Sequence, residues 1–190
     1  ETFMLNALSS PDQLRQRMTY ALSQMFVISD RFDFAGHDEL MMGYADILHR
    51  NAFGNYRDLL REVTLHPAMG MFLAMLGNEK ADPERNIRPD ENFAREVMQL
   101  FTVGLQLLNQ DGSPIIDQTT GLPVQTYGPA DVQNYAAAFT GWYFADQPSY
   151  KFGDSFHSVE WDERLAPMTP YEDFHQNTQK KLLRNYYVPA

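Results

Sequence analysis

Apolar residues recur three or four positions apart along most of residues 14–139, which is the spacing of one face of an α-helix. Ser10, Pro11 and Asp12 form a helix start signal, a capping residue followed by a first-turn proline and an acid. The pattern predicts a first helix to about Ser29. Its expected inward positions are Leu14, Met18, Ala21, Leu22, Met25 and Ile28.

Three further helices are predicted before residue 77. The second lies within residues 37–50, before Asn51 and Gly54, and its inward positions are Leu40, Met41, Tyr44, Ile47 and Leu48. The third runs from about Asn55 to His66, and its inward positions are Tyr56, Leu59, Leu60 and Val63. Pro67 suits a first turn and restarts the helix, so the almost wholly apolar residues 68–76 should lie at the centre of the core.

The most regular helical pattern follows the polar loop at residues 77–90. From Asp90 it predicts a long fifth helix with inward positions Phe93, Val97, Leu100, Phe101, Gly104, Leu105 and Leu108. Glycine and proline turn signals in residues 109–128 predict a small hairpin or ordered loop. A sixth helix is expected from Pro129 to about Thr140, ending at Gly141, with inward positions Val132, Tyr135, Ala136 and Phe139.

Residues 142–161 alternate aromatic and polar side chains, which predicts edge strands or an aromatic-rich loop, and a short helix is expected around residues 179–185. The chain is therefore predicted to be mainly α, with about six packed helices and a small irregular or β-rich C-terminal segment. Residues 1–190 are expected to form a single domain, with a helical core at 1–142 and an aromatic, acidic segment at 143–190.

Composition narrows the classes of function. The formal net charge of −10 argues against a nucleic-acid partner, because phosphate binding needs clustered lysine and arginine. The absence of cysteine excludes disulfides and thiolate chemistry, and no apolar run is long enough to span a membrane. The chain begins at Glu1 and ends without a polar tail, so it is expected to be a piece of a longer protein.

Four segments identify a family. "LRQRMTYALSQMFVIS", "LLREVTLHPAMGMFLAMLGNEKADP", "RPDENFAREVMQLFTVGL" and "YGPADVQNYAAAFTGW" resemble, in order and spacing, the DUF1800 family of bacterial proteins of unknown function. The resemblance continues in "FHQNTQKKLL", where the family has a histidine followed five residues later by a lysine, here His175 and Lys180. Gln176 and Thr178 depart from the commonest form of this motif, which has Asp and Gly there.

The resemblance implies a partner and a location. Members of the family are typically longer, often exported, and often encoded beside DUF1501 proteins, which look like the alkaline-phosphatase and sulfatase superfamily. A DUF1501-type partner and a periplasmic or extracellular location are therefore expected. The family supplies no established catalytic residues.

Asn92 and Glu96 are the first candidate site. They share one shoulder of the apolar stripe of the fifth predicted helix, where a partly desolvated carboxylate can act as a general acid or base. The structural alternative is favoured, in which an arginine from another helix pairs with Glu96. The arginines considered for this ion pair are Arg15, Arg17 and Arg57.

Acidic residues and histidines of the C-terminal segment form a second candidate, a divalent-metal site. Its residues are Asp154, His157, Glu160, Asp162 and His175. Because the spacing matches neither an EF-hand nor an HExxH motif, a solvated acidic loop is favoured. Trp142 and Trp161 could floor a carbohydrate or peptide groove, although core packing is favoured for such aromatics. His49 and His66 are expected at helix C-termini, where imidazole interacts well with the helix dipole.

Two functions are compatible with these features. The first is an exported, non-catalytic binding or accessory protein. The alternative is a metal-assisted hydrolase built on Glu96 and the C-terminal histidine and acidic cluster, with Asn92, His175 and Lys180 as further catalytic candidates.

Overall fold

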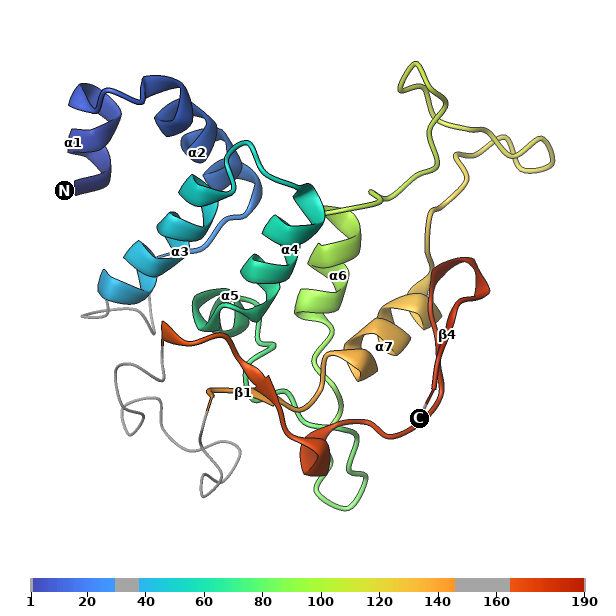
Figure 1. The fold of residues 1–190 in the computed structure, drawn as a ribbon. Coiled ribbons are helices and arrows are strands. Elements are labelled where there is room, and N and C mark those ends of the chain that lie inside the picture. Colours follow the sequence, from blue (N-terminus) through green and yellow to red (C-terminus); the bar gives the residue numbers. More distant parts are fainter. Residues whose placement is uncertain (1, 30–37, 146–164, 190) are drawn as a thin grey trace. The chain divides into compact units, whose positions relative to one another are not determined.

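The protein is mainly α-helical, as predicted. A computed structural model describes residues 2–29, 38–145 and 165–189, in which it has seven α-helices and two two-stranded sheets (Figure 1). The chain divides into two compact units. The first unit is Glu1–Leu76 with Tyr143–Thr169, and the second is Gly77–Trp142 with Pro170–Ala190. From the chain length we predict that residues 1–190 form a single domain, and this stays a prediction.

Five helices form the described part of the first unit, with α3 in contact with α2, α4 and α5. They are α1 (Thr2–Ser9), α2 (Gln13–Met25), α3 (Asp38–Arg50), α4 (Tyr56–Leu65) and α5 (Pro67–Phe72). Four of the predicted inward residues of α3 are buried, namely Leu40, Tyr44, Ile47 and Leu48. The helical pattern of residues 38–50 therefore identified both the helix and its core face.

The predicted inward face of α2 is wrong except at Leu22, which is buried as predicted. Leu14 is 72% exposed and Met25 is 47% exposed, whereas the buried residues of the helix are Gln16, Thr19 and Leu22. The polar groups on the buried face are satisfied, because the Thr19 hydroxyl donates to Arg15 O at 2.9 Å and Gln16 Nε2 donates to Asp12 Oδ1 at 3.1 Å. A hydrogen-bonded polar face has thus packed against α3 in place of the more apolar face.

The next two helices begin as predicted, and α5 ends early. Asn55 caps α4 by accepting a hydrogen bond from Arg57 N–H at 2.8 Å, and Pro67 is the first residue of α5. The helix ends at Phe72, and Ala74 adopts a left-handed φ of 57°. Leu59 and Val63 are buried as predicted, but Tyr56 is 43% exposed.

The second unit contains α6 (Asn92–Gln99) and α7 (Pro129–Ala138), which pack on each other. Phe93 of α6 meets Phe139 edge to face, with ring centroids 4.9 Å apart. Val132 and Ala136 are buried, and Gly141 lies in the left-handed region after the helix, in agreement with the predicted sixth helix.

The long fifth helix that the sequence predicts is wrong beyond Leu100. The helix ends at Gln99, and Gly104, which has a left-handed φ of 71°, donates from its N–H to Met98 O at 2.9 Å, so the chain after α6 is not helical. Isolated antiparallel bridges then join residues 106–125 into the predicted hairpin structure. As a result Leu105 and Leu108 are exposed rather than buried.

The helix predicted at residues 179–185 is also wrong. β3 (Lys180–Lys181) pairs antiparallel with β4 (Tyr187–Val188) around a 3-10 turn at Leu183–Asn185. Arg184 and Asn185 both have positive φ, which an α-helix does not allow. Earlier in this segment, β1 (Trp142–Tyr143) pairs with β2 (Thr169–Pro170), and the 3-10 helix η2 spans Glu172–Phe174. In the described part of the chain, no helix combines the length and the hydropathy that a membrane span requires.

Gly141→Ala should destabilise the protein more than Gly112→Ala. Both glycines have left-handed φ values, 83° and 84°, so each alanine meets the same backbone strain of about 1 kcal/mol. A Cβ on Gly141 would also lie 2.9 Å from His175 N and from Tyr171 O, whereas one on Gly112 meets nothing within 4 Å. Urea unfolding of the two variants measures the difference. Equal losses of unfolding free energy would show that the close backbone approach at Gly141 contributes nothing.

Candidate functional site

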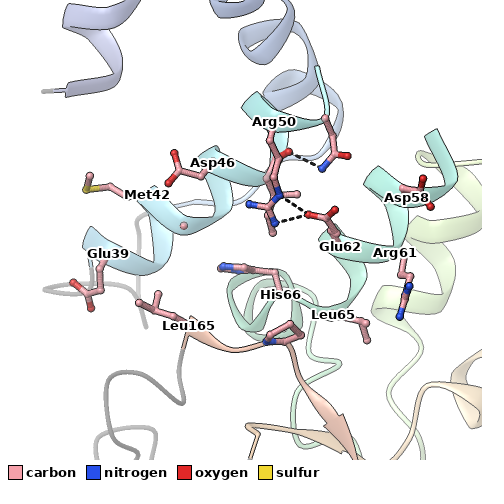
Figure 2. A pocket seen from close by; sticks show the side chains of 14 residues that line it. Glu39, Met42, Asp46, Arg50, Asp58, Arg61, Glu62, Leu65, His66 and Leu165 are labelled. Carbon is pink, nitrogen blue, oxygen red and sulfur yellow. Dashed lines mark hydrogen bonds and ion pairs between the residues drawn. The ribbon is translucent and has the colours of Figure 1, made fainter. Parts of the chain in front are cut away.

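A groove of about 820 Å³ opens in the first unit between α3 and α4 (Figure 2). The α3 side is formed by Glu39, Gly43, Asp46 and Arg50, which are four, three and four residues apart and therefore share one face of the helix. This face adjoins the buried face of α3. One face of α3 therefore packs in the core, and the adjacent face lines the groove.

Residues of α4 form the opposite side of the groove, and they include Asp58, Arg61 and Glu62. Arg50 of α3 donates from Nε to Glu62 Oε2 at 2.8 Å, and its Nη2 donates to the same oxygen (Figure 2). Leu165 and Pro167, from a distant part of the sequence, add apolar surface. The groove therefore combines an ion pair, further acidic side chains and apolar side chains.

His66 reaches the groove from the junction of α4 and α5 and is only 5% exposed. Its Nδ1 accepts a hydrogen bond from Ala68 N–H at 3.2 Å, so the ring caps the N-terminus of α5. An accepting Nδ1 places the proton of the neutral ring on Nε2. Burial, with a smaller effect from the positive charge of Arg50, lowers the pKa of His66 to about 4.

This arrangement corrects the interpretation of His66 as a helix C-terminal cation. Although it follows the last residue of α4, the ring acts as a neutral acceptor at the start of α5. His49, in contrast, lies in the last turn of α3 as expected, where its Nε2 is 3.2 Å from Asp12 Oδ2.

Asn92 and Glu96 both lie on α6, as predicted. Asn92 is exposed, whereas Glu96 is half-buried and its Oε2 is buried without a hydrogen-bond partner in the described part of the chain. Arg95 pairs with Glu91 at 2.8 Å, and the described residues include no ion pair of Glu96 with any arginine. The arginine brace expected for Glu96 is therefore missing from the described structure.

His175 and Lys180 lie side by side in the second unit. His175 Nδ1 donates to Thr140 O at 2.8 Å, which leaves the Nε2 lone pair to accept from Lys180 Nζ at 3.4 Å. Lys180 is only 2% exposed, and burial lowers its pKa. No carboxylate of the described residues forms an ion pair with it. No described hydrogen bond joins this pair to Asn92 or Glu96.

Of the other candidate residues from the sequence, the structure describes only Trp142. Trp142 is half-buried in β1, while Asp154, His157, Glu160, Trp161 and Asp162 lie outside the described residues. Within the described ranges, no group of three or more acidic or histidine side chains is arranged to hold a metal ion.

Sequence reasoning missed the groove, because its residues are far apart in the chain and each has an ordinary interpretation as a helix-ending histidine or a solvated charge. One signal is present in the sequence. Gly43 interrupts an otherwise good helix at the position where Glu39, Asp46 and Arg50 recur at helical spacing.

The pKa of His66 predicts a specific pH dependence of stability. Its folded-state pKa of about 4 lies below the ordinary 6.5, so its stabilising contribution is complete above pH 6.5 and is lost as the pH falls through 4. The total loss is on the order of 3 kcal/mol. Denaturant unfolding between pH 7 and pH 4 should show a shallower decline for His66→Asn, because asparagine still caps α5 but does not titrate. An unchanged slope in this variant would assign the decline to other groups.

Lys180→Met should leave the protein equally stable or raise its unfolding free energy at pH 7 by about 1 kcal/mol, because it removes a buried charge that has no carboxylate partner among the described residues. The folded-state pKa lies below the ordinary 10.5, so the penalty of the native lysine is complete below the folded pKa and vanishes above 10.5. The gain should therefore shrink as the pH rises toward 10.5. Lys181→Met, at the exposed neighbour on β3, is the matched control and should change little. A large loss in Lys180→Met would show that the amine stabilises the fold.

The comparisons with known proteins return one result. The profile of the family described as "Protein of unknown function (DUF1800)" matches residues 1–189, in agreement with the resemblance seen in the sequence segments. Neither the curated proteins nor the solved structures contain a match. Since the match covers nearly the whole chain, this protein is a member of the DUF1800 family.

Proposed function

We propose that this chain is an exported, non-catalytic binding or accessory protein that acts in the periplasm or outside the cell. The observation that supports binding is the apolar face that α2 leaves exposed. Leu14, Met18, Ala21 and Met25 are four, three and four residues apart, the spacing of a coiled-coil seam. Leu14, Met18 and Met25 are 72%, 39% and 47% exposed.

This seam is separate from the face by which α2 packs in its own unit. Gln16, Thr19 and Leu22 form that second face and are buried. A helix that packs through one face and presents an apolar seam on another has the geometry that receives a partner helix. The exposed Arg17 flanks the seam, so an acidic residue beside the partner's apolar stripe would complement it.

The family resemblance supports a DUF1501-type protein as the partner, because such proteins are often encoded beside members of this family. It also supports export. The partner is inferred from association between genes and export from the family resemblance, so a binding experiment tests the partner.

One observation favours the alternative, a metal-assisted hydrolase. Glu96 Oε2 is buried and has no partner in the described residues, and a buried carboxylate oxygen without a partner is unusual outside functional sites. In this alternative Glu96 acts with Asn92, His175 and Lys180, and the cation is held by Asp154, His157, Glu160 and Asp162. Trp142 and Trp161 would then line a substrate groove.

Leu14→Gln with Met18→Gln should abolish association with a DUF1501-type protein from the same organism. Light scattering after size-exclusion chromatography of the mixed purified proteins should show a complex with the native chain and separate species with the double variant. The reason is that glutamine keeps the helix but removes the apolar surface that a partner helix would cover.

Leu122→Gln is the matched control, since Leu122 is 64% exposed in the hairpin region and should not affect association. No complex with the native chain, or an unaltered complex with the double variant, would refute the proposed binding surface. Elemental analysis of the purified protein tests the alternative. Stoichiometric zinc or manganese, together with a hydrolytic activity that Glu96→Gln abolishes without loss of the metal, would favour the enzyme.

A further inference from the structure

We propose that the groove between α3 and α4 binds an uncharged polyhydroxylated ligand, a short saccharide, through a hydrogen bond donated by His66 Nε2. This site involves neither the α2 seam nor a partner protein, so it stands independently of the function proposed above. Four features of the groove carry the inference.

The first feature is a donor without a partner. His66 Nδ1 is used to cap α5, so the Nε2–H is free to donate, and no hydrogen bond within the described residues uses it. Burial, with a smaller effect from Arg50, lowers the pKa of His66 and keeps the ring neutral near pH 7. A neutral imidazole N–H requires an acceptor, such as a hydroxyl or carbonyl oxygen.

The second feature is Gly43, which lies inside α3 opposite this donor. Glycine in a helix interior costs about 1 kcal/mol relative to alanine, so the helix itself does not favour it. A Cβ at this position would lie 3.4 Å from His66 Nε2 and 3.6 Å from Leu165 Cδ2. Gly43 therefore leaves open the space beside Nε2 that an acceptor oxygen would occupy, and any other residue would fill it.

The third feature is the balance of charge. Glu39, Asp46, Asp58 and Glu62 outnumber Arg50 and Arg61 around the groove, which disfavours an anion. At the His66 end, however, burial and the nearby positive charge of Arg50, which is paired with Glu62, both disfavour a further positive charge. An uncharged ligand avoids both penalties.

The fourth feature is that the groove offers acidic side chains that can bind hydroxyl groups and apolar surface that can contact a sugar ring. Asp46 and Asp58 are acids of the two groove walls, and no described hydrogen bond or ion pair uses their side chains (Figure 2). Their carboxylates can accept from hydroxyls while His66 donates to one, and a sugar hydroxyl can do both. Leu165 and Met42 offer apolar surface to the C–H faces of the ring, and about 820 Å³ lies within the usual range for small-molecule sites.

Gly43→Ala separates ligand binding from folding. Both distances to the added methyl are ordinary van der Waals contacts, so alanine fits, and its helix propensity should leave the melting temperature unchanged or higher. Saturation-transfer NMR with cellobiose, maltose and N,N′-diacetylchitobiose should show binding of at least one disaccharide to the native chain. Its affinity should fall at least tenfold in Gly43→Ala.

His66→Asn provides a second variant, because asparagine keeps the cap on α5 but removes the Nε2–H. It should weaken binding of the same disaccharide to a similar extent, while Ala45→Gly, elsewhere on α3, should leave the affinity unchanged. A glucuronic-acid disaccharide and chitobiose provide anionic and cationic arms, and preferential binding of either would reject the uncharged class. Absence of binding by all three neutral disaccharides, or equal binding by Gly43→Ala, would overturn the site.

Discussion

Burial of one face of α3 is the constraint on which the first unit depends, and Tyr44 lies at its centre. The Tyr44 hydroxyl donates to Phe26 O at 2.9 Å, and its ring meets the edge of His66 with centroids 5.6 Å apart. One side chain therefore connects α3 to the end of α2 and to the start of α5. Burial raises the pKa of Tyr44 above its usual range, so the hydroxyl keeps the proton that it donates. Once this face is buried, the adjacent face with Gly43 and Arg50 must line the groove.

The second unit has its own anchor at Thr140 and Gly141, directly after α7. The buried Thr140 accepts from Gln176 N–H at Oγ1 and from His175 Nδ1 at its carbonyl, and Gly141 N–H bonds to Asn78 O at 2.8 Å. These bonds orient His175 toward Lys180. The position of the buried amine then depends on backbone geometry at Gly141, where no side chain fits. A buried amine beside an imidazole, without a carboxylate partner in the described residues, is an arrangement that is also found at reactive sites.

The sequence predicted well those helices whose apolar stripe is the face that the tertiary structure buries. In α3 the pattern identified Leu40, Tyr44 and Ile47 as core, and in α7 the proline and glycine signals marked both ends. It failed after Gln99, where α6 ends although apolar residues continue at helical spacing, and Gly104 adopts a left-handed φ that a longer helix would not allow. The family assignment needed no structure, because long motifs specify a family even where they misplace a helix end.

By itself the sequence determined the family, the mainly helical class, and the positions of most helices before Gly141. Periodicity supports this much because it reports that a helix has an apolar face. Only the tertiary structure decided which face is covered, as α2 shows by burying Gln16 and exposing Leu14. The tertiary structure also decided that the His66 ring would lie next to Gly43 of α3. The two residues are far apart in the sequence, so their distance depends on how the helices pack, and a local sequence pattern carries no information on packing.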